Sequence, residues 1–414
     1  MTSRSWVGEQ LAAIRAADRW RSTRGFDACG PEGVVDGRAV VSFAGNDYLG
    51  LSTHPAVTAA AHAALDRWGA GATASRLVVG TRPVHHDLEA ALAEWKGTEA
   101  AVVLPSGYAA NLAVLTTFGG PDCLVVSDEL NHASIIDGCR LSRSEVAVAR
   151  HGDVDHVDDL LVRSGAPRAM VVTDSVFSMD GDEAPVAALA EMCARRGALL
   201  VLDDAHAVLG PAVDLAEVGG LELLRVLTLS KALGSLGGAV AGSRDAVDLL
   251  VNRARPFIFS TGLSPADAAA ALAAVGVVRG DEGRALVRRL RSHVERLRPG
   301  HPSPIVPVVL GEERAALDAA AALLDRGLLV PAIRPPTVAP GTSRLRVALS
   351  AAHTDAQVTA LLDALTCLET GRGSCSPAFE TGRESCAPPS ETGRGSCAPA
   401  FETGRGSCAP EATS

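Results

Sequence analysis

The sequence predicts an α/β protein with a mostly parallel central sheet in a large domain and a smaller α/β domain towards the C-terminus. Three observations indicate this fold. Short apolar runs alternate with segments of helical periodicity, an order typical of parallel sheets. Polar motifs directly follow several of the apolar runs, where ligands collect in such sheets. The chain of 414 residues, of which 47% are hydrophobic, is long enough for two domains.

The composition argues against nucleic acid and membrane partners. The formal net charge is -10, and no stretch gathers basic residues into a patch. The first residues lack the basic start and apolar core of a signal peptide, and the longest alanine-rich run, Ala268 to Val278, is too short to cross a bilayer. We therefore expect a soluble, cytoplasmic protein.

Cysteine and histidine spacing predicts no metal site. Of the nine cysteines, Cys29, Cys123, Cys139 and Cys193 are scattered through the body of the chain without CxxC spacing. We expect reduced thiols and neither a zinc site nor a disulfide framework. His85 and His86 are adjacent on a segment of helical periodicity, where neighbouring side chains diverge, so they do not predict a shared metal ion.

The N-terminal region is expected to hold an amphipathic helix, a short strand and a second helix. Residues 5–24 show apolar positions at helical spacing among charged ones. The run from Ala39 to Phe43 predicts a β-element, and Pro55 opens a helix that ends near Trp68. The glycine-rich segment 69–76 follows a helix and lacks the ending of a nucleotide P-loop, so it does not predict a phosphate site.

The strand predicted at Ala100–Leu104 leads into a helix that begins with a candidate anion site. Ser106, Gly107 and Tyr108 form the turn between the two elements. Backbone N–H groups at such a helix start have no acceptor within the helix and attract anions. An ordinary turn capped by Ser106 is the alternative.

Two further predicted strands deliver candidate site residues at their carboxyl ends. The strand from Cys123 to Ser127 leads to His132, and the strand from Ala169 to Asp174 leads to Ser178. A helix predicted from Val186 to Arg196 then separates this strand from the next. Both residues are thus expected just past the carboxyl end of a strand, where ligands collect in open parallel sheets.

The next strand, from Ala198 onward, ends in Asp203 and Asp204 and is followed by His206. Alternation along a strand sends the two carboxylates to opposite faces. One can face a ligand crevice, and a buried aspartate there needs a cationic partner, such as a protonated pyridine nitrogen.

Lys231 is expected at the end of a buried strand, in a confined space next to a glycine-rich turn. The apolar run Arg225 to Leu229 precedes it, and glycines 234, 237 and 238 follow. A lysine that is partly desolvated loses its proton more readily and can form a Schiff base with an aldehyde. A solvated lysine at a strand corner is the alternative.

The C-terminal third predicts a smaller α/β unit. Its expected elements are helix 284–296, strand Ile305–Leu310, helix 312–326 and strand Ser343–Leu349. Within the last strand Arg344 and Arg346 share a face, and either could clamp a carboxylate in bidentate fashion. Surface ion pairs are the alternative.

Four parts are expected along the chain. Residues 1–45 would form an N-terminal arm that packs with the small domain, 46–283 the large domain and 284–368 the small domain. From 369 to 414 an 11-residue unit recurs that is rich in glycine, proline, serine and threonine. Each unit has too few large apolar residues for a stacked core, so disorder is predicted.

Eight motifs in order resemble those of the α-oxoamine synthases, which are pyridoxal-phosphate (PLP) enzymes of the fold-type I aminotransferase superfamily. The resemblance covers residues of about 5 to 368. The motifs are Asn46-Asp-Tyr-Leu-Gly50, Ser75-Arg-Leu77, Ser106-Gly-Tyr108, Asn131-His-Ala-Ser134, Val176-Phe-Ser-Met-Asp-Gly181, Asp203-Asp-Ala-His206, Thr228-Leu-Ser-Lys231 and Ala332-Ile-Arg-Pro-Pro-Thr-Val338.

The resemblance implies catalytic roles for residues around the cofactor ring. Lys231 would carry PLP covalently, and Asp203 would keep the pyridine nitrogen protonated. His132 would stack on the ring, and His206 with Ser178 would contact its phenolic oxygen. The segment after His206 is shorter than the family pattern, which has a Gly-Arg-Gly-Ser segment there.

The resemblance also implies phosphate and substrate contacts. The phosphate would be held at one helix start and one strand end: Ser106, Gly107, Tyr108 and Thr228. The second subunit of a homodimer with shared active sites would add a contact from Ser260 or Thr261. Arg346 would grip the carboxylate of the amino acid, and Arg21 would lie near the acyl substrate.

Within the family, the closest likeness is to enzymes that condense L-alanine with a pimeloyl thioester, carried by coenzyme A or a carrier protein, in biotin biosynthesis. Family members that use glycine with a short acyl-CoA, such as 2-amino-3-ketobutyrate ligase and 5-aminolevulinate synthase, are one alternative. A PLP aminotransferase and a non-catalytic binding protein are the others.

Overall fold

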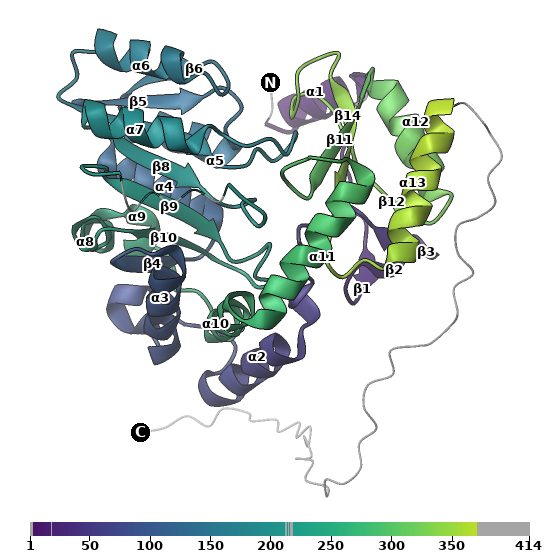
Figure 1. Ribbon diagram of the computed structural model, residues 1–414, viewed down its shortest axis with the longest axis horizontal. Helices are drawn as coiled ribbons and strands as arrows, with labels where there is room; N and C mark the ends of the chain where they lie inside the picture. Colours follow the sequence, from purple (N-terminus) through teal and green to yellow (C-terminus); the bar gives the residue numbers. More distant parts are fainter. Residues whose placement is uncertain (1–2, 18, 212, 214, 216–217, 371–414) are drawn as a thin grey trace, which may run out of the picture. The chain divides into compact units, whose positions relative to one another are not determined.

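The central feature of the structure, a computed structural model, is a seven-stranded sheet (Figure 1). The description covers residues 3–17, 19–211, 213, 215 and 218–370. In sheet order the strands are β4 (Ala100–Leu104), β10 (Gly238–Gly242), β9 (Leu223–Thr228), β8 (Leu199–Asp203), β7 (Arg168–Asp174), β5 (Cys123–Asp128) and β6 (Glu145–Ala149). β9, β8, β7, β5 and β6 run parallel, whereas β10 is antiparallel to β9 and β4. The carboxyl ends of the parallel strands therefore meet at one edge.

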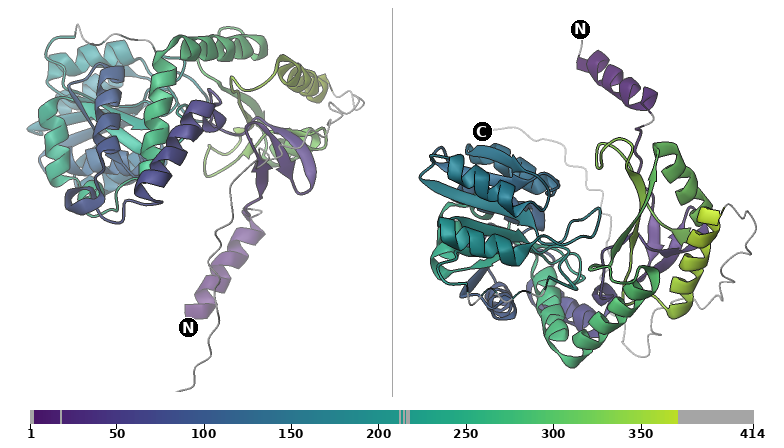
Figure 2. Two further views of the ribbon diagram at one scale, coloured as in Figure 1. Left: turned by 90° about the horizontal axis from the view of Figure 1, so that it is seen from below. Right: turned by 45° about the horizontal axis from the view of Figure 1, so that its top comes forward.

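Helices cover both faces of this sheet, as Figure 1 and Figure 2 show. One face packs against α4 (Gly107–Phe118), α5 (Ala133–Ser142), α8 (Arg244–Arg253) and α9 (Arg255–Ile258). The other packs against α3 (Pro83–Lys96), α10 (Pro265–Arg279), α6 (Val154–Arg163) and α7 (Val186–Arg196). In β4, Val102 points to the first face and Val103 to the second. Because both faces are buried, the strands are continuous apolar runs.

Two smaller sheets contain the remaining strands. One has the order β1-β2-β3-β12 and the other β11-β14-β13. Their bounds are Phe26–Ala28 (β1), Glu32–Val35 (β2), Arg38–Ser42 (β3), Leu328–Leu329 (β12), Ile305–Gly311 (β11), Ser343–Ala348 (β14) and Ala332–Ile333 (β13). α12 (Glu313–Leu324) contacts both sheets, and β12 pairs in parallel with β3. The N-terminal strands are thereby joined to the C-terminal part of the chain.

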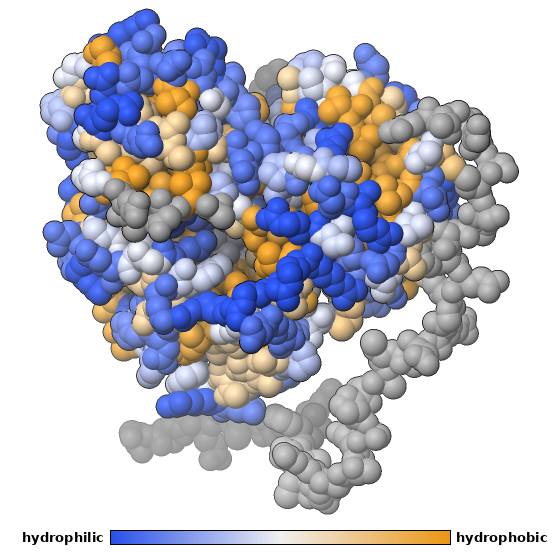
Figure 3. Space-filling model, in the orientation of Figure 1, coloured by the Kyte–Doolittle hydropathy of each residue, from blue (hydrophilic) through white to orange (hydrophobic). Residues whose placement is uncertain are grey.

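The other helical segments include α11 (Asp281–Leu297), whose amphipathic pattern is clear. Leu290 and Val294 are buried, while Arg284 and Arg288 are exposed. Figure 3 shows hydrophilic surface in the region of this helix. The remaining segments are α1 (Ser3–Ala16), the 3-10 turn η1 (Leu51–Thr53), α2 (Pro55–Trp68), the π-helix η2 (Arg76–Gly80) and α13 (Asp355–Thr370). None of the helices described here is long and apolar enough to span a membrane.

The predicted elements match the structure best where apolar periodicity is strong. α2, β4 and α7 have the bounds expected from the sequence. The helix predicted over 5–24 is wrong beyond Ala16, where α1 ends. The glycine-rich segment after Lys231 also contains β10, which the sequence does not predict because small residues hide the apolar pattern of a strand. β1, β2, β6 and α13 are likewise not predicted.

The packing of the N-terminal arm stays a prediction, as do the domain boundaries. The apolar side chains of α1 are exposed, including Trp6 and Leu11. Residues 371–414 of the repeat tail lie outside the described residues.

The histidine pair diverges as the helical spacing predicts. His85 is buried, and its ring contacts the backbone N–H of Arg82 at 2.8 Å and the carbonyl of Leu263 at 2.8 Å. His86 lies beside Glu89 instead. Free thiols are found at Cys29, Cys123, Cys139 and Cys193. Within the described part of the chain, no group of three or more His, Cys, Asp or Glu side chains could hold a metal ion.

Candidate active site

The carboxyl edge of the central sheet brings acidic strand ends and a lysine together. β5, β7 and β8 end in Asp128, Asp174 and Asp203, and Asp174 pairs with Asp203 in register. β9 ends in Thr228 at the same edge, and the chain then turns back as β10. Lys231 lies within this turn.

A tight turn fixes the position of Lys231. Its carbonyl accepts a hydrogen bond from the N–H of Gly234 at 2.9 Å. Gly234 has a φ of 60°, and a Cβ there would lie 2.2 Å from the backbone nitrogen of Ser52. Glycine is required at this position because a side chain would meet both backbone strain and a clash.

Lys231 lies among buried polar side chains that alter its protonation. Burial lowers the pKa of Lys231, and the positive charge of Arg346 lowers it further. The carboxylates of Asp203 and Asp174 act in the opposite direction, but the net shift is downward. The amine is therefore available as a nucleophile or base at a lower pH than an ordinary lysine.

A chain of hydrogen bonds orients Lys231. Its Nζ lies 2.8 Å from Nε2 of His206, whose Nδ1 lies 2.6 Å from the hydroxyl of Tyr48. Tyr48 donates to Oδ1 of Asn46 at 3.0 Å. When Tyr48 gives its proton to Asn46, Nδ1 of His206 donates to Tyr48 and Nε2 accepts from Lys231.

The neutral state of His206 fits this chain of donors. Burial, followed by the positive charges of Lys231 and Arg346, lowers the pKa of His206 well below its usual value. Burial also raises the pKa of Tyr48 to about 12. The neutral ring of His206 can therefore accept a hydrogen bond from Lys231.

Asp203 is a buried carboxylate without an ionic partner among the described residues. Its Oδ2 accepts from Nδ2 of Asn111 at 2.6 Å, and its Oδ1 accepts from the N–H of Ala205 at 3.0 Å. Burial raises the pKa of Asp203, although Asn111 and the charge of Lys231 oppose the shift. A cationic ligand group beside Asp203 would stabilise its ionised form.

Asp204 points the other way and is fully paired. It forms ion pairs with Arg225 at 2.8 Å and Lys96 at 3.4 Å, and Ser175 donates to it at 2.9 Å. Burial alone would raise the pKa of Asp204, but Lys96 and Arg225 lower it overall. The two adjacent aspartates therefore have separate environments, as strand alternation predicts.

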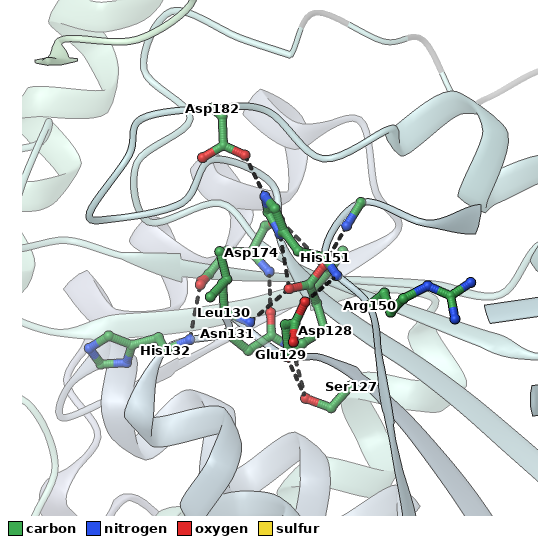
Figure 4. Close-up of polar contacts among 12 residues, drawn as sticks. Ser127, Asp128, Glu129, Leu130, Asn131, His132, Arg150, His151, Asp174 and Asp182 are labelled. Atoms are coloured by element: carbon green, nitrogen blue, oxygen red, sulfur yellow. Dashed lines mark hydrogen bonds and ion pairs between the residues drawn. The ribbon is translucent and has the colours of Figure 1, made fainter. Parts of the chain in front are cut away.

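His132 caps the start of α5 and contacts the same network. Its Nδ1 lies 2.8 Å from the hydroxyl of Ser134, which accepts from Asn111 at 2.8 Å. Its backbone N–H donates to Oδ2 of Asp174 at 3.0 Å (Figure 4). Burial lowers the pKa of His132; the charge of Asp203 opposes this shift, and the charge of Lys231 adds to it. Burial, and then the charge of Asp203, raises the pKa of Asp174.

The predicted anion site has the geometry of a helix start. Ser106 is the N-cap of α4, and its hydroxyl accepts from the N–H of Ala109 at 3.1 Å. Gly107 and Tyr108 occupy the first helical positions, whose N–H groups have no acceptor within the helix. A Cβ on Gly107 would lie 3.2 Å from Cβ of Thr228, so the turn and the end of β9 are in close contact.

The side chain of Tyr108 and the residues Ser260 and Thr261 have other partners or positions. The hydroxyl of Tyr108 donates to the carboxylate of Asp137, so at the helix start Tyr108 contributes its backbone N–H. Ser260 and Thr261 follow α9, and Thr261 forms an isolated bridge with Ser75.

The two arginines of β14 differ in their partners. Arg344 forms an ion pair with Asp180 and donates to the carbonyl of Thr342 at 2.9 Å. Arg346 donates to the carbonyl of Ser178 at 2.6 Å and to Asn46 at 3.2 Å. No described carboxylate pairs with Arg346, so its charge can serve a ligand.

Arg21 lines a cavity of about 270 Å³. The other lining residues are Arg19, Ala332, Ile333, Arg334, Pro335 and Thr337. The cavity joins the predicted N-terminal arginine to one of the eight motifs.

Sequence reasoning assigned no role to Asn46, Tyr48, Asn111 or Asp174. Asn46 and Tyr48 belong to the motif Asn46-Asp-Tyr-Leu-Gly50, which is the one sequence feature that pointed to them. Their contacts cross long distances in the sequence, since Tyr48 and His206 are 158 residues apart. Such pairings follow from the fold and not from local spacing.

The architecture and the site define a class of protein. A parallel sheet that presents a buried lysine, an unpaired buried aspartate and a helix-start anion site is that of a fold-type I PLP-dependent transferase. A family model described as aminotransferase class I and II matches residues 38–365, and the chain belongs to this family.

Relatives of known name extend the comparison. An 8-amino-7-oxononanoate synthase of Anaeromyxobacter dehalogenans is 52% identical over 375 residues, which cover 87% of this chain and 94% of the relative. One from a Methylobacterium species is 52% identical over 372 residues, covering 87% of this chain and 96% of the relative.

Solved structures show the same fold. A serine palmitoyltransferase from S. paucimobilis has a TM-score of 0.83 at 30% identity, covering 90% of this chain and 100% of that one. An 8-amino-7-oxononanoate synthase from Francisella tularensis has a TM-score of 0.66 at 24% identity, covering 80% and 98%.

Proposed function

We propose that this chain performs the reaction of the 8-amino-7-oxononanoate synthases. L-Alanine and a pimeloyl thioester would give 8-amino-7-oxononanoate, carbon dioxide and the free thiol. The observation that carries the proposal is the 52% identity to synthases of that name over 87% of the chain. A pimeloyl group on coenzyme A and one on a carrier protein are both compatible with it.

The residues of the site fit PLP. The helix start at Gly107 and Tyr108, with Thr228, suits a phosphate, and Asp203 lacks the cation that a protonated pyridine nitrogen would supply. Lys231 would hold the cofactor aldehyde. When bound, PLP supplies an electron sink for negative charge at the α-carbon of the amino acid.

The protein groups would then bind the substrate and move its protons. Lys231, with its lowered pKa, would take the α-proton and return a proton to the same carbon. Its contact with neutral His206 keeps the amine directed into the site. His132 would lie against the cofactor ring, and Ser178 would address its phenolic oxygen together with His206.

Arg346 is proposed to bind the substrate carboxylate. We expect Arg346→Lys to reduce kcat/KM for L-alanine by about 100-fold, chiefly through KM, because a bidentate charged contact is lost. Arg344→Lys is the matched control, since Asp180 already pairs with Arg344. Steady-state kinetics of both variants test the assignment, and equal losses would contradict it.

A homodimer with shared sites is proposed, with the partner supplying a contact from Ser260 or Thr261. Exposed apolar side chains beside this segment support it: Leu77 at 54%, Val78 at 72%, Val79 at 64% and Phe259 at 70% exposure. Packing this patch against a second copy would remove it from water. Sedimentation equilibrium tests the proposal, and a monomer at micromolar concentration would exclude it.

A substrate assay tests the proposed reaction. The purified protein with PLP is supplied with L-alanine or glycine, and with pimeloyl-CoA or pimeloyl carrier protein. We expect carbon dioxide release with L-alanine and a product with the mass of 8-amino-7-oxononanoate. Preference for glycine with a short acyl-CoA, or transfer of the amino group to an oxo acid, would replace the proposal. The cytoplasmic location stays a prediction that cell fractionation tests.

A further inference from the structure

A histidine outside the cofactor site lies between two carboxylates. His151 follows β6, and its Nδ1 lies 3.1 and 3.2 Å from the two carboxylate oxygens of Asp128. Its Nε2 lies 2.8 Å from Oδ2 of Asp182 (Figure 4). The ring packs edge-on against Phe177, with ring centroids 4.4 Å apart at 86°. Three segments of the chain thus fix one imidazole.

The contacts identify the protonation state of His151. A neutral imidazole donates from one nitrogen only, whereas an ionised carboxylate only accepts. Both contacts are therefore hydrogen bonds only if His151 is an imidazolium. Burial opposes the charged ring, but hydrogen bonds and charge from Asp128, and then Asp182, raise the pKa of His151 overall.

Among the described residues, His151 is the one hydrogen-bond donor to the carboxylate of Asp182. Its Oδ1 is buried and has no hydrogen-bond partner among the described residues. Its Oδ2 accepts only from His151 in that part of the chain. Loss of the imidazolium proton would leave this carboxylate without a side-chain donor, which is costly in a partly buried site.

Asp128 links His151 to the segment that contains His132. Asp128 also accepts from the N–H of Leu130 at 2.8 Å and from that of Gly152 at 3.0 Å. Glu129 accepts from the N–H of His151 at 2.9 Å. These bonds hold the segment that ends in His132 at the start of α5.

Asp182 links His151 to the loop that contacts Arg346. The N–H of Phe177 donates to the carbonyl of Asp182 at 3.0 Å, which closes a short loop. Ser178 lies in that loop, and its carbonyl accepts from Arg346 at 2.6 Å. His151 therefore connects the segment of His132 to the loop that supports Arg346.

We propose that His151 is a positioning residue. As an imidazolium between Asp128 and Asp182, it holds the His132 segment and the Ser178 loop in fixed positions relative to each other. Deprotonation of His151 loosens both segments together. The functional part of the inference rests on the proposed synthase reaction.

The other charged groups nearby have their own partners. Arg150 pairs with Asp153 at 2.6 Å, and His156 accepts from the N–H of Arg150 at 2.9 Å. His301, on which Asp182 also acts, contacts the carbonyl of Ile305 at 2.6 Å, and burial lowers its pKa. Asp174 interacts with Asp128 and bonds His132. No described lysine or arginine pairs with Asp128 or Asp182, so His151 supplies their cation.

The raised pKa sets the direction of the pH effect. A group whose pKa is higher in the folded state stabilises the fold fully below its unfolded pKa, and this contribution is lost as pH rises through the folded pKa. The link through His151 is therefore complete in mildly acidic solution and weakens on the alkaline side. We expect kcat/KM for L-alanine to fall at alkaline pH, because His132 and Arg346 are then no longer held in fixed relative positions.

The test combines a titration with kinetics. The PLP-loaded wild type, His151→Gln, Asp182→Asn and the control His62→Gln, at an exposed position of α2, are labelled on histidine and titrated by NMR. The His151 signal is assigned by its absence in His151→Gln. We expect it to titrate above 6.5 in the wild type and at a lower pH in Asp182→Asn.

Kinetics then test positioning against mere stability. His151→Gln is expected to lower kcat/KM by about tenfold at neutral pH and to remove the alkaline limb that follows His151. Asp182→Asn should shift that limb to lower pH, and His62→Gln should change neither. A His151 signal at or below 6.5, or an unshifted limb in Asp182→Asn, would overturn the proposal. The NMR titration needs no substrate, so failure of the proposed reaction is distinguishable from failure of this link.

Discussion

Replacing Lys231 with alanine is expected to lower turnover of L-alanine by at least about 10³-fold. The amine is the only described basic side chain in contact with His206 Nε2, and burial lowers its pKa. Steady-state release of carbon dioxide measures the effect. Because burying an ammonium is unfavourable, the variant should unfold at a temperature no lower than the wild type.

The chain supplies a matched control for this variant. Its sequence contains two lysines, Lys96 and Lys231. Lys96 pairs with Asp204 on the opposite face, and Lys96→Arg keeps that charge. We expect near-normal turnover in Lys96→Arg. Turnover that survives in Lys231→Ala would remove Lys231 from the catalytic role.

The neighbouring aspartates should give opposite phenotypes when each is changed to asparagine. Asp203→Asn is expected to lower turnover by about 10²- to 10³-fold, because an amide cannot hold a pyridine nitrogen in its protonated form. The fold should persist, since Asp203 has no ionic partner among the described residues and Asn111 can still donate to the amide oxygen.

Asp204→Asn should instead reduce stability. It leaves Arg225 and Lys96 partly buried without their carboxylate, and breaking such a pair costs about 3 to 5 kcal/mol in the free energy of unfolding. Turnover per folded molecule should stay within a few-fold of the wild type. Denaturant unfolding and kinetics of both variants provide the comparison; loss of turnover in Asp204→Asn with full activity in Asp203→Asn would reverse the assignment.

The sequence predicts the sheet edge and its main groups because both depend on local patterns. Apolar runs mark β5, β7, β8 and β9, and the residues just after a parallel strand must lie at the shared edge. Strand alternation alone separates Asp203 from Asp204. For these features, the position of a residue in the sequence determines its position in the fold.

Other features depend on contacts that local spacing does not encode. Tyr48 reaches His206 from an N-terminal turn, and Asn111 reaches Asp203 from the buried side of α4. Their importance follows only when the helix and strands are packed. The antiparallel β10 was likewise hidden, because its glycine and alanine residues resemble a turn.

Long-range contacts hold the segment after His206. Leu209 is buried, and its carbonyl accepts from Arg291 of α11 at 2.7 Å. These contacts fix the beginning of the segment that follows His206, whose Nε2 lies 2.8 Å from Nζ of Lys231.

Borohydride reduction of the purified holoenzyme, followed by peptide mass spectrometry, tests whether Lys231 carries PLP. With two lysines in the sequence, two peptides can carry a reduced pyridoxyl group. We expect the added mass on the peptide that contains Lys231 and none on the peptide that contains Lys96. Label on Lys96, or a protein that binds PLP without labelling either lysine, would contradict it.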